Sequence, residues 1–445
     1  MKPRQVLTGL AWAATAAVAV RGLSGARHTM RSLDFVSQPQ PAPVADVKPY
    51  FLLIVPMLRE QKLITDTVAY FAGLARAWGP ASVVIVTTEA ELVASGAGPS
   101  TPDLAAQLAG QDHGGAHVTH HHLADPHGDM ADQINYAAQV ELARLAADGV
   151  PLTSVFVAVY NADSRPDPAT LPTVAAAAAQ GDVRIAQQSA LFTTGLGQHG
   201  LVADGIALMQ SRWTLAREIP RLRRQASQAR RTRGRARVPR FAHCVGHGLF
   251  LRADVLQAMS GLPTATMNED HALGYLASAA GIPIEPLPLL EYADSPPTAW
   301  LSIQQTRQWF WAYPDYLTAH RLAAAAQLGT PFTRTAITTQ GLGRGVLWLG
   351  QSPAVLATVA LPVLARRKDA SALAAAAALG LYLLPFAAIG RHLRAQGQQV
   401  PGPAAAAVGG LAAALISSIG PWWCLGRVVR KALLGTSYQH EKTED

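Results

Sequence analysis

With 445 residues the chain is long enough for two or three domain-sized units, and its net charge is +8. Only 15% of the residues are charged, against roughly 25% in ordinary globular proteins, and this shortage is concentrated in particular segments. The two cysteines, Cys244 and Cys424, lie far apart, which excludes a disulfide framework and a cysteine-based zinc signature.

The N-terminus carries an uncharged apolar run at residues 5–20. Such a run is typical of a signal peptide, a short membrane anchor or a helix that lies on the bilayer. No small-residue cleavage site clearly follows it, so we favour an uncleaved anchor. Arg21, Arg27 and Arg31 come just after the run, and the positive-inside rule then places the following residues in the cytoplasm.

Residues 36–49 are rich in proline and glutamine, which is typical of a linker. From residue 50 onward, continuous apolar runs, typical of strands buried on both faces, alternate with segments of helical spacing. We expect strands at residues 50–56, 81–86, 155–160 and 184–192. We expect helices at residues 62–78, 129–147 and 168–180. This alternation predicts an α/β domain with a mostly parallel sheet that is covered on both faces.

Polar side chains follow the predicted strands. Glu60 follows the first strand, Thr88 ends the second, and Asp163 follows the third along the chain. Ligands of such sheets bind beyond the carboxyl ends of the strands, so the pattern predicts a site for a nucleotide or a similar polar ligand. The Gly-x-Gly-x-x-Gly fingerprint and the Gly-x-x-x-x-Gly-Lys loop are both absent from the sequence, which argues against a nicotinamide cofactor and a kinase-type ATP site.

Two polar segments allow other interpretations. Residues 109–128 are rich in glycine and histidine, and we expect a flexible surface loop because the histidines show no regular metal-ligand spacing. Eleven arginines occur between Arg212 and Arg240. They are compatible with nucleic acid, with anionic lipid headgroups or a phosphate-bearing substrate, and with a disordered solvated loop. No RNA-binding motif accompanies them, so we prefer lipid or phosphate to nucleic acid.

Three uncharged runs, at residues 345–365, 370–390 and 400–426, are each long enough to cross a bilayer. A soluble alanine-rich bundle is less favoured because its helices would show a charged face. Three spans would leave the basic tail around Arg430 on the side opposite the catalytic domain, whereas the positive-inside rule places it in the cytoplasm. One run therefore lies in the interface or re-enters, and the run at 400–426 is the hardest to place.

Two short motifs fit the chemistry of sugar transfer from a nucleoside diphosphate. The departing diphosphate develops negative charge that a divalent cation neutralises, and hard cations take carboxylate oxygens such as those of Asp163. A carboxylate near the acceptor hydroxyl can accept its proton, which fits Glu269 and Asp270. Each motif alone is also typical of a turn or of a helix N-terminus.

Six short segments gain meaning from their order, at residues 55–60, 129–135, 161–163, 246–248, 269–270 and 305–309. In this order they resemble the motifs of family 2 glycosyltransferases, particularly the membrane-bound group that includes cellulose and hyaluronan synthases. The resemblance implies a donor side made by Pro56, Glu60, Thr88, Asn135, Asn161 and Asp163. It also implies that Asp163 holds Mg²⁺ or Mn²⁺, since Asn161 and Asp163 resemble the Asp-x-Asp metal motif.

The same resemblance implies that Asp270 is the catalytic base, with Glu269 beside it, because the pair resembles the Thr-Glu-Asp motif. It implies an acceptor side made by Gly246, His247, Gly248, Gln305, Arg307 and Trp309. Trp309 has two interpretations, stacking on a sugar or packing in a core with neighbouring aromatic residues.

Four places depart from the family pattern. The first metal-motif aspartate is Asn161, and the expected lysine falls at Met130. The usual acidic residue after the second strand is replaced by Thr87 and Thr88, and the arginine of the last motif falls at Gln308, next to Arg307. Each change removes charge from a site that handles a diphosphate. The departures favour either a lineage with different donor contacts or a non-catalytic membrane protein on a glycosyltransferase scaffold that acts in an assembly.

The resemblance therefore implies an anchor and linker at residues 1–44, a GT-A type catalytic domain at 45–330, and transmembrane helices with a basic tail at 331–445. The implied function is that of an inverting, metal-dependent glycosyltransferase of polysaccharide biosynthesis. Its expected partners are a nucleotide-sugar donor, a lipid-linked or glycan acceptor and the membrane, without nucleic acid. Its expected location is the plasma membrane, with several spans and a cytoplasmic catalytic domain.

Overall fold

The computed structural model describes residues 3–38, 48–94, 98–236, 238–365 and 367–434, and within them one seven-stranded sheet has the order β3-β2-β1-β4-β6-β5-β7. The strands are β1 (Tyr50–Pro56), β2 (Ala81–Thr88), β3 (His117–Leu123), β4 (Val155–Val159), β5 (Ile185–Thr194), β6 (Leu249–Arg252) and β7 (Ile284–Asp294). Only β6 runs antiparallel to its neighbours, which confirms the prediction of a mostly parallel sheet.

Both faces of the sheet are covered because side chains alternate along its central strands. In β1, Phe51 and Leu53 face one core, while Leu52 and Ile54 face the other. The first core is completed by α2 (Ile64–Trp78), α3 (Thr101–Ala109) and α5 (Thr170–Gln180). The second core is completed by α4 (Met130–Ala147), α8 (Ala253–Ala258) and α9 (Glu269–Ala280). This double coverage explains the continuous apolar runs in the sequence.

The prediction of a flexible surface loop at residues 109–128 is wrong for residues 117–123, which form β3, a strand at one edge of the sheet. It pairs in parallel with β2, from Ser82 opposite His117 to Thr88 opposite Leu123. The histidines replace the usual β-branched residues and stay half-buried by finding polar partners. The Thr87 hydroxyl contacts His120 Nε2 at 2.8 Å, which is one of these contacts.

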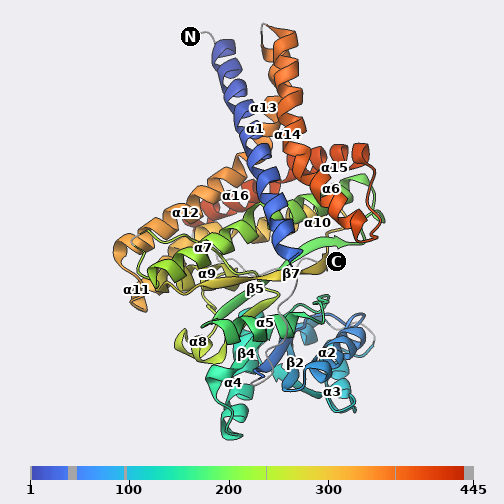
Figure 1. The fold of residues 1–445 in the computed structure, drawn as a ribbon, viewed down its shortest axis with the longest axis vertical. Coiled ribbons are helices and arrows are strands. Elements are labelled where there is room, and N and C mark those ends of the chain that lie inside the picture. The colour runs from blue at the N-terminus through green and yellow to red at the C-terminus, as the bar shows by residue number, and fades with distance from the viewer. Residues whose placement is uncertain (1–2, 39–47, 95–97, 237, 366, 435–445) are drawn as a thin grey trace.

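A layer of helices lies above the sheet (Figure 1). It contains α6 (Leu201–Trp213), a π-helical turn (Thr214–Glu218), α7 (Ile219–Thr232), α10 (Ala299–Phe310), α11 (Ala312–Ala325) and α12 (Pro331–Leu349). The arginine-rich segment is therefore helical from its start to Thr232, not a disordered loop, and it forms the middle of this layer.

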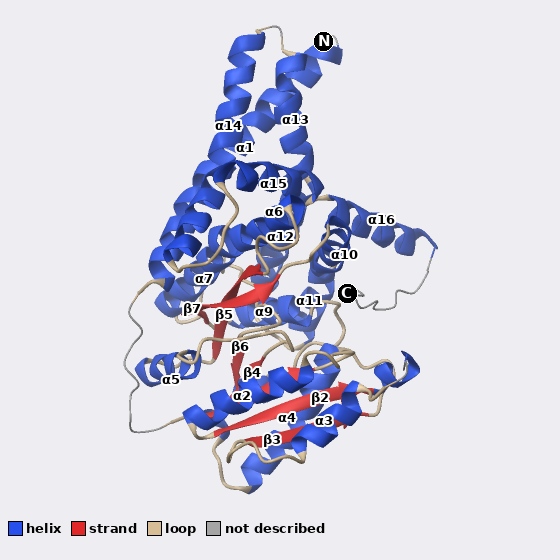
Figure 2. Ribbon diagram, turned by 90° about the vertical axis from the view of Figure 1, so that its right-hand side faces the viewer, coloured by secondary structure: helices blue, strands red, loops and turns tan. Residues whose placement is uncertain are grey.

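Three helices rise together from the layer: α1 (Pro3–Val36), α13 (Gln351–Leu364) and α14 (Lys368–Ala395). Figures 1 and 2 both show them extending away from the sheet, while α15 (Pro403–Ile416) and α16 (Ile419–Leu434) lie across their direction. Gly22 of α1 lies so close to α14 that a Cβ atom there would be 2.5 Å from the backbone of Leu381. The N-terminal run is thus part of a packed bundle.

By length and composition, α1, α14 and the segment Pro403–Leu434 could each cross a membrane, as could α12 and α13 together as one span bent by 40°. Two predicted runs are interrupted. The run at 345–365 breaks at Gly350, between α12 and α13, and the run at 400–426 breaks between α15 and α16. Of the predicted linker, residues 39–47 lie outside the described residues.

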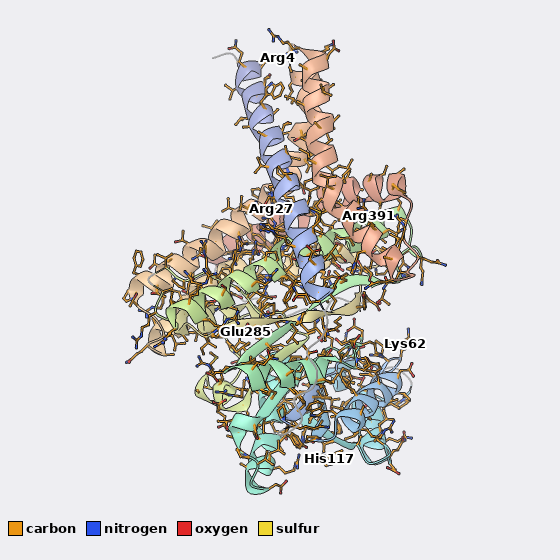
Figure 3. All side chains as sticks on the ribbon, in the orientation of Figure 1. Arg4, Arg27, Lys62, His117, Glu285 and Arg391 are labelled. Carbon is orange, nitrogen blue, oxygen red and sulfur yellow. The ribbon has the colours of Figure 1, made fainter. Side chains whose placement is uncertain are left out.

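Basic residues mark the ends of the raised helices. Figure 3 shows Arg4 at the far end of α1, whereas Arg27 of α1 and Arg391 of α14 lie at the level of the helical layer. The apolar parts of α1 and α14 therefore run between two levels of positive charge.

Candidate active site

A cavity of about 1700 Å³ lies between the carboxyl edge of the sheet and the helical layer. Four strands end at its wall, which includes Pro56 of β1, Thr88 of β2, Thr194 of β5 and Asp294 of β7. The turn after β4 adds Asn161 and Asp163 to the same wall. The parallel strands thus deliver their polar residues to one place.

Most of the predicted donor residues line this cavity, namely Pro56, Glu60, Thr88, Asn161 and Asp163. Asn135 is not among the lining residues of the described chain. Its amide instead holds the turn after α8, with Oδ1 accepting from the Leu262 N–H at 2.7 Å and Nδ2 donating to the Leu262 carbonyl at 2.9 Å. Asn135 is therefore a structural residue here, although the family pattern suggested donor contact.

The loop that carries Glu60 is fixed by a buried carboxylate that the sequence analysis did not single out. Glu91 is 2% exposed and accepts hydrogen bonds from the Arg59 N–H at 2.8 Å and from Gln61 Nε2 at 2.8 Å. Arg59 adopts a left-handed conformation with φ of 58°. These bonds hold the strained turn that places Glu60 at the cavity wall.

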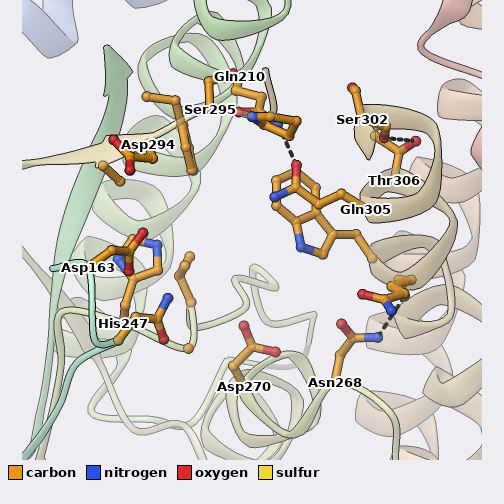
Figure 4. Close-up of a pocket in the computed structure, with 18 of the residues that line it drawn as sticks. Asp163, Gln210, His247, Asn268, Asp270, Asp294, Ser295, Ser302, Gln305 and Thr306 are labelled. Atoms are coloured by element: carbon orange, nitrogen blue, oxygen red, sulfur yellow. Dashed lines mark hydrogen bonds between the residues drawn. The ribbon is translucent and has the colours of Figure 1, made fainter. Parts of the chain in front are cut away.

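Asp163 lies where several charges meet. Burial raises the pKa of its carboxyl, His247 opposes that shift, and Glu291 and Asp294 add to it. Figure 4 shows Asp163 beside His247, with Asp294 on the same side of the cavity. Within the described residues, no group of three or more His, Cys, Asp or Glu side chains is placed to hold a metal ion by itself.

His247 carries positive charge next to Asp163. Burial is the largest influence and lowers the pKa of the imidazole, but the carboxyls of Glu291, Glu218 and Asp163 together outweigh it and raise the pKa of His247 to about 9. The Nδ1 of His247 lies 3.2 Å from Oε2 of Glu291. An imidazolium at this point suits the binding of a diphosphate.

Glu269 and Asp270 open α9, and both line the cavity with Gly246 and Met130. A Cβ atom at Gly246 would lie 3.6 Å from Glu269 Oε1 and 3.7 Å from Asp270 Oδ2. These are ordinary contact distances, so the backbone of Gly246 lies directly beside the two carboxyls. Burial and the neighbouring Asp270 raise the pKa of Glu269 to about 8, so Glu269 is largely protonated near neutral pH.

Stacked rings hold the start of α9 in place. The ring of His243 stacks on that of His271, with ring centroids 4.1 Å apart. Trp213 of α6 also stacks on His243, with ring centroids 5.3 Å apart. The His271 N–H donates to Asp270 Oδ1 at 2.6 Å. The position of Asp270 therefore depends on packing between α6 and α9.

Four of the six residues predicted for the acceptor side lie at the cavity wall. Gly246, His247, Gln305 and Trp309 line the cavity, and Gln305 Oε1 accepts a hydrogen bond from Gln210 Nε2 at 2.6 Å (Figure 4). Gly248 lies outside the wall, in a left-handed turn with φ of 61° against Gln188. Arg307 also lies outside it.

Arg307 cannot replace the missing arginine of the last motif, because its guanidinium stacks on Trp423 of α16 at 4.5 Å. Gln308, at the expected position, is the residue that faces the cavity. Trp309 also faces it, whereas Phe310 and Trp311 belong to a separate buried core. The structure thus places Trp309 at the cavity and not in that core.

Several lining residues were missed by the sequence analysis, including Gln210, Glu218, Asp294 and a set of arginines. Their helical spacing was the available signal, since Arg217 and Arg221 are four residues apart and share one helix face. Arg21 and Arg344, which come from α1 and α12, carried no such signal.

A family model described as "Glycosyl transferase family group 2" matches residues 156–389, from β4 into α14. No curated protein matches the chain. Among solved structures, the mannosyltransferase PcManGT from Pyrobaculum calidifontis, in complex with GDP-Man and Mn²⁺, is similar with a TM-score of 0.50 and 17% identity, covering 97% of this chain and 100% of that chain.

S. aureus TarS 1-349 in complex with UDP is also similar, with a TM-score of 0.38 and 15% identity, covering 79% of this chain and 93% of that chain. The likeness to PcManGT and the mostly parallel sheet show a GT-A type glycosyltransferase fold.

Proposed function

The chain belongs to glycosyl transferase family group 2, and from this premise we propose an inverting transfer of a sugar from a nucleoside-diphosphate donor to a lipid-linked or glycan acceptor at a membrane. The observation that carries the proposal is one cavity lined by both Asp163 and Asp270. Because α1, α12, α13 and α15 also contribute to its wall, the cavity adjoins the apolar helices.

The donor nucleotide would lie over the ends of β1 and β2, near Glu60 and Thr88. Its diphosphate would lie near Asp163 and the imidazolium of His247. The positive charge of His247 compensates in part for the lysine charge that is missing at Met130.

Asp163 is the carboxylate best placed to hold a divalent cation, as Mg²⁺ or Mn²⁺. Its fit rests on the chemistry of the donor set, because such ions keep waters and substrate phosphates and need only one or two carboxylates. Asn161 and Asp294 share its wall and offer further oxygen atoms. When bound, the ion would supply charge neutralisation to the departing diphosphate. The similar mannosyltransferase was solved with Mn²⁺, which supports this class of cofactor.

Asp270 would accept the proton of the acceptor hydroxyl. The hydroxyl oxygen would then bond to the anomeric carbon of the sugar while the bond from that carbon to the nucleoside diphosphate breaks. Glu269, protonated near neutral pH, can donate a hydrogen bond to Asp270 or to the acceptor. Trp309 and Gln305 would hold the acceptor on the far side, since aromatic faces are rigid apolar platforms.

The test is transfer or donor hydrolysis by the full chain, in nanodiscs, with a panel of nucleotide sugars. Asp270→Asn should lose transfer by at least about 100-fold, the order expected for a lost general base, while it keeps nucleotide binding. Full activity of Asp270→Asn would remove the proposed base.

We also propose that α1 and α14 cross the bilayer, and that α13 crosses it as the outer part of the bent span that it forms with α12. The rest of α12, together with α15 and α16, would lie at the cytoplasmic face, and the chain would belong to the membrane-bound, cellulose synthase-like group. The chain would leave the cytoplasm through α13 and return through α14, so the basic tail stays inside. In this arrangement the basic level marked by Arg27 and Arg391 lies on the cytoplasmic side, as the positive-inside rule favours (Figure 3).

Cysteine labelling in intact cells tests this topology. A membrane-impermeant maleimide should label Asp369→Cys, in the first turn of α14, but not Lys431→Cys in α16. The reverse pattern, or labelling of both, would contradict it. Native Cys244 and Cys424 are buried and give little background.

A further inference from the structure

Five arginines from five elements line one part of the cavity wall: Arg21 of α1, Arg212 of α6, Arg217 of the π-helical turn, Arg221 of α7 and Arg344 of α12. We call this group the arginine chamber. Residues of α12, α13 and α15 complete the wall beside it, and Arg21 donates to the Leu347 carbonyl at 3.1 Å. The chamber therefore lies where the cavity meets the raised helices.

The arginine chamber lacks carboxylate partners. None of its five guanidinium groups forms an ion pair within the described parts of the chain. Arg212 is only 5% exposed, yet its Nε and Nη2 have no hydrogen-bond partner there. The same holds for the buried Nη1 of Arg221 and of Arg344. Unpartnered buried donors of this kind call for a ligand, because leaving them unpaired costs stability.

The positive charges also act on one another. Burial and then the neighbouring Arg21, Arg221 and Arg212 lower the pKa of Arg217 to about 9. Glu218 lies among them, but burial raises the pKa of its own carboxyl to about 7, so one partial negative charge faces five positive ones. Such a concentration of like charge is stabilised by a multivalent anion.

Building on the glycosyltransferase function proposed above, we propose that the arginine chamber binds the phosphate or diphosphate of a lipid-anchored acceptor. Guanidinium forks match phosphate oxygens in pairs, which explains arginine at all five positions. The apolar helices α1, α13 and α14 would accommodate the lipid chain. The acceptor hydroxyl would then extend along the same cavity toward Asp270.

The elements that form this anion site differ from those that form the donor site. The donor-side residues Glu60, Thr88 and Asp163 lie at strand ends, whereas the arginines come from helices on the other side of the cavity. Glu218 links the two regions, because Asp270 and Arg221 both influence the pKa of its carboxyl. An acceptor that reaches from chamber to base would pass this residue.

The experiment measures binding of farnesyl diphosphate to the full chain in phosphatidylcholine nanodiscs by calorimetry. Arg217→Gln and Arg221→Gln should each weaken binding by about 10- to 100-fold, the range expected for a lost hydrogen bond to a charged group. Arg231→Gln is the matched control, because Arg231 is exposed on α7 and bonds only to Ser227. The control should bind like the wild type, and equal binding by all variants would overturn the proposal.

Two further ligands in the same binding experiment identify the source of the phosphate. Inorganic pyrophosphate should bind more weakly than farnesyl diphosphate and with the same dependence on Arg217 and Arg221. Phosphatidylglycerol in the nanodisc should not compete. If it competes as well as farnesyl diphosphate, the chamber binds bulk anionic lipid and the acceptor assignment is overturned.

Nucleotide binding separates this proposal from the proposed function. With UDP or GDP and Mn²⁺, the arginine variants should keep the thermal shift of the wild type while they lose farnesyl diphosphate. Loss of the nucleotide shift with retained farnesyl diphosphate would assign the arginines to the donor and overturn the proposal. A wild type that binds farnesyl diphosphate but no nucleotide would refute the transferase chemistry and leave the anion site standing.

Discussion

Asp163 and Asp270 line the same cavity, the first in the turn after β4 and the second in the first turn of α9. Figure 4 shows both carboxylates directed into one space, with His247 next to Asp163. One bound donor and one acceptor can therefore meet a cation-side carboxylate and a proton-accepting carboxylate together. The two residues should accordingly fail in different ways when they are changed.

Asp163→Asn should remove most of the cation-dependent stabilisation by nucleotide. A ligand at 100 times its dissociation constant stabilises a protein by about 2.7 kcal/mol, so the loss is measurable as a shift of the melting temperature. Chelation of divalent ions by EDTA should have the same effect on the wild type. Asp270→Asn is the matched control and should retain the shift. A full Mn²⁺-dependent shift in Asp163→Asn would show that another residue holds the ion.

Trp309→Ala should lower kcat/KM for the acceptor by about tenfold, since an aromatic contact contributes about 0.5–1.5 kcal/mol beyond its buried area. The Trp309 ring lies at the cavity wall and not in the core that contains Phe310 and Trp311. Its centroid is 6.3 Å from that of the Phe192 ring. Trp309→Phe should retain most activity. A change in nucleotide binding instead of acceptor kinetics would contradict the acceptor role.

Four of the seven described strands, β1, β2, β4 and β5, and the helices α2, α4 and α5 were predictable because their signals are local. The apolar runs ending at Pro56 and Val159 reflect double coverage of a parallel sheet, and α4 begins where Asp129 caps it and Asp132 completes the capping box. The position of the site was predictable as well, because the carboxyl ends of parallel strands lie at the same edge of a sheet. Local periodicity therefore predicted most of the fold that positions Asp163.

The remaining features depend on contacts between distant segments. β3 was missed because its histidines are acceptable as strand residues only beside Thr87 and Glu141, which contribute hydrogen bonds from other elements. Asn135 matched a motif, yet its amide is committed to Leu262. The arginine chamber joins Arg21 to helices of the middle and late chain, and no spacing rule connects them.

Glu218 should make stability depend on pH. Burial raises the pKa of its carboxyl from 4.5 to about 7, so the folded state binds the proton more tightly than the unfolded state. Its contribution is complete below pH 4.5 and is lost as the pH rises through 7. A shift of this size corresponds to about 3 kcal/mol.

Glu218→Gln removes this titration, so between pH 5 and pH 8 it should lose up to about 3 kcal/mol less stability than the wild type, while Glu269 and His247 titrate in both proteins. Thermal unfolding of both proteins in nanodiscs at several pH values measures the difference. The two melting temperatures should converge toward pH 5 and differ most near pH 8. Parallel curves over the whole range would mean that Glu218 is already ionised in the folded protein.

Gly22→Ala should separate α1 from α14. A Cβ atom there would lie 2.5 Å from the backbone atoms of both Leu381 and Tyr382, and backbone in a packed helix cannot yield cheaply. Small residues allow such close approach of helices in membranes, so we expect a loss of about 1–3 kcal/mol. Because α1 carries Arg21, farnesyl diphosphate binding should weaken as well.

Gly9→Ala is the control on the same helix, because no atom lies within 4 Å of its added Cβ. Alanine is favoured over glycine inside a helix by about 1 kcal/mol, so this variant should equal or exceed the wild type in melting temperature. The comparison therefore separates helix propensity from helix contact. If Gly22→Ala were as stable as Gly9→Ala, α1 would not pack on α14 in the membrane. Arg21 of α1 would then not be held at the arginine chamber.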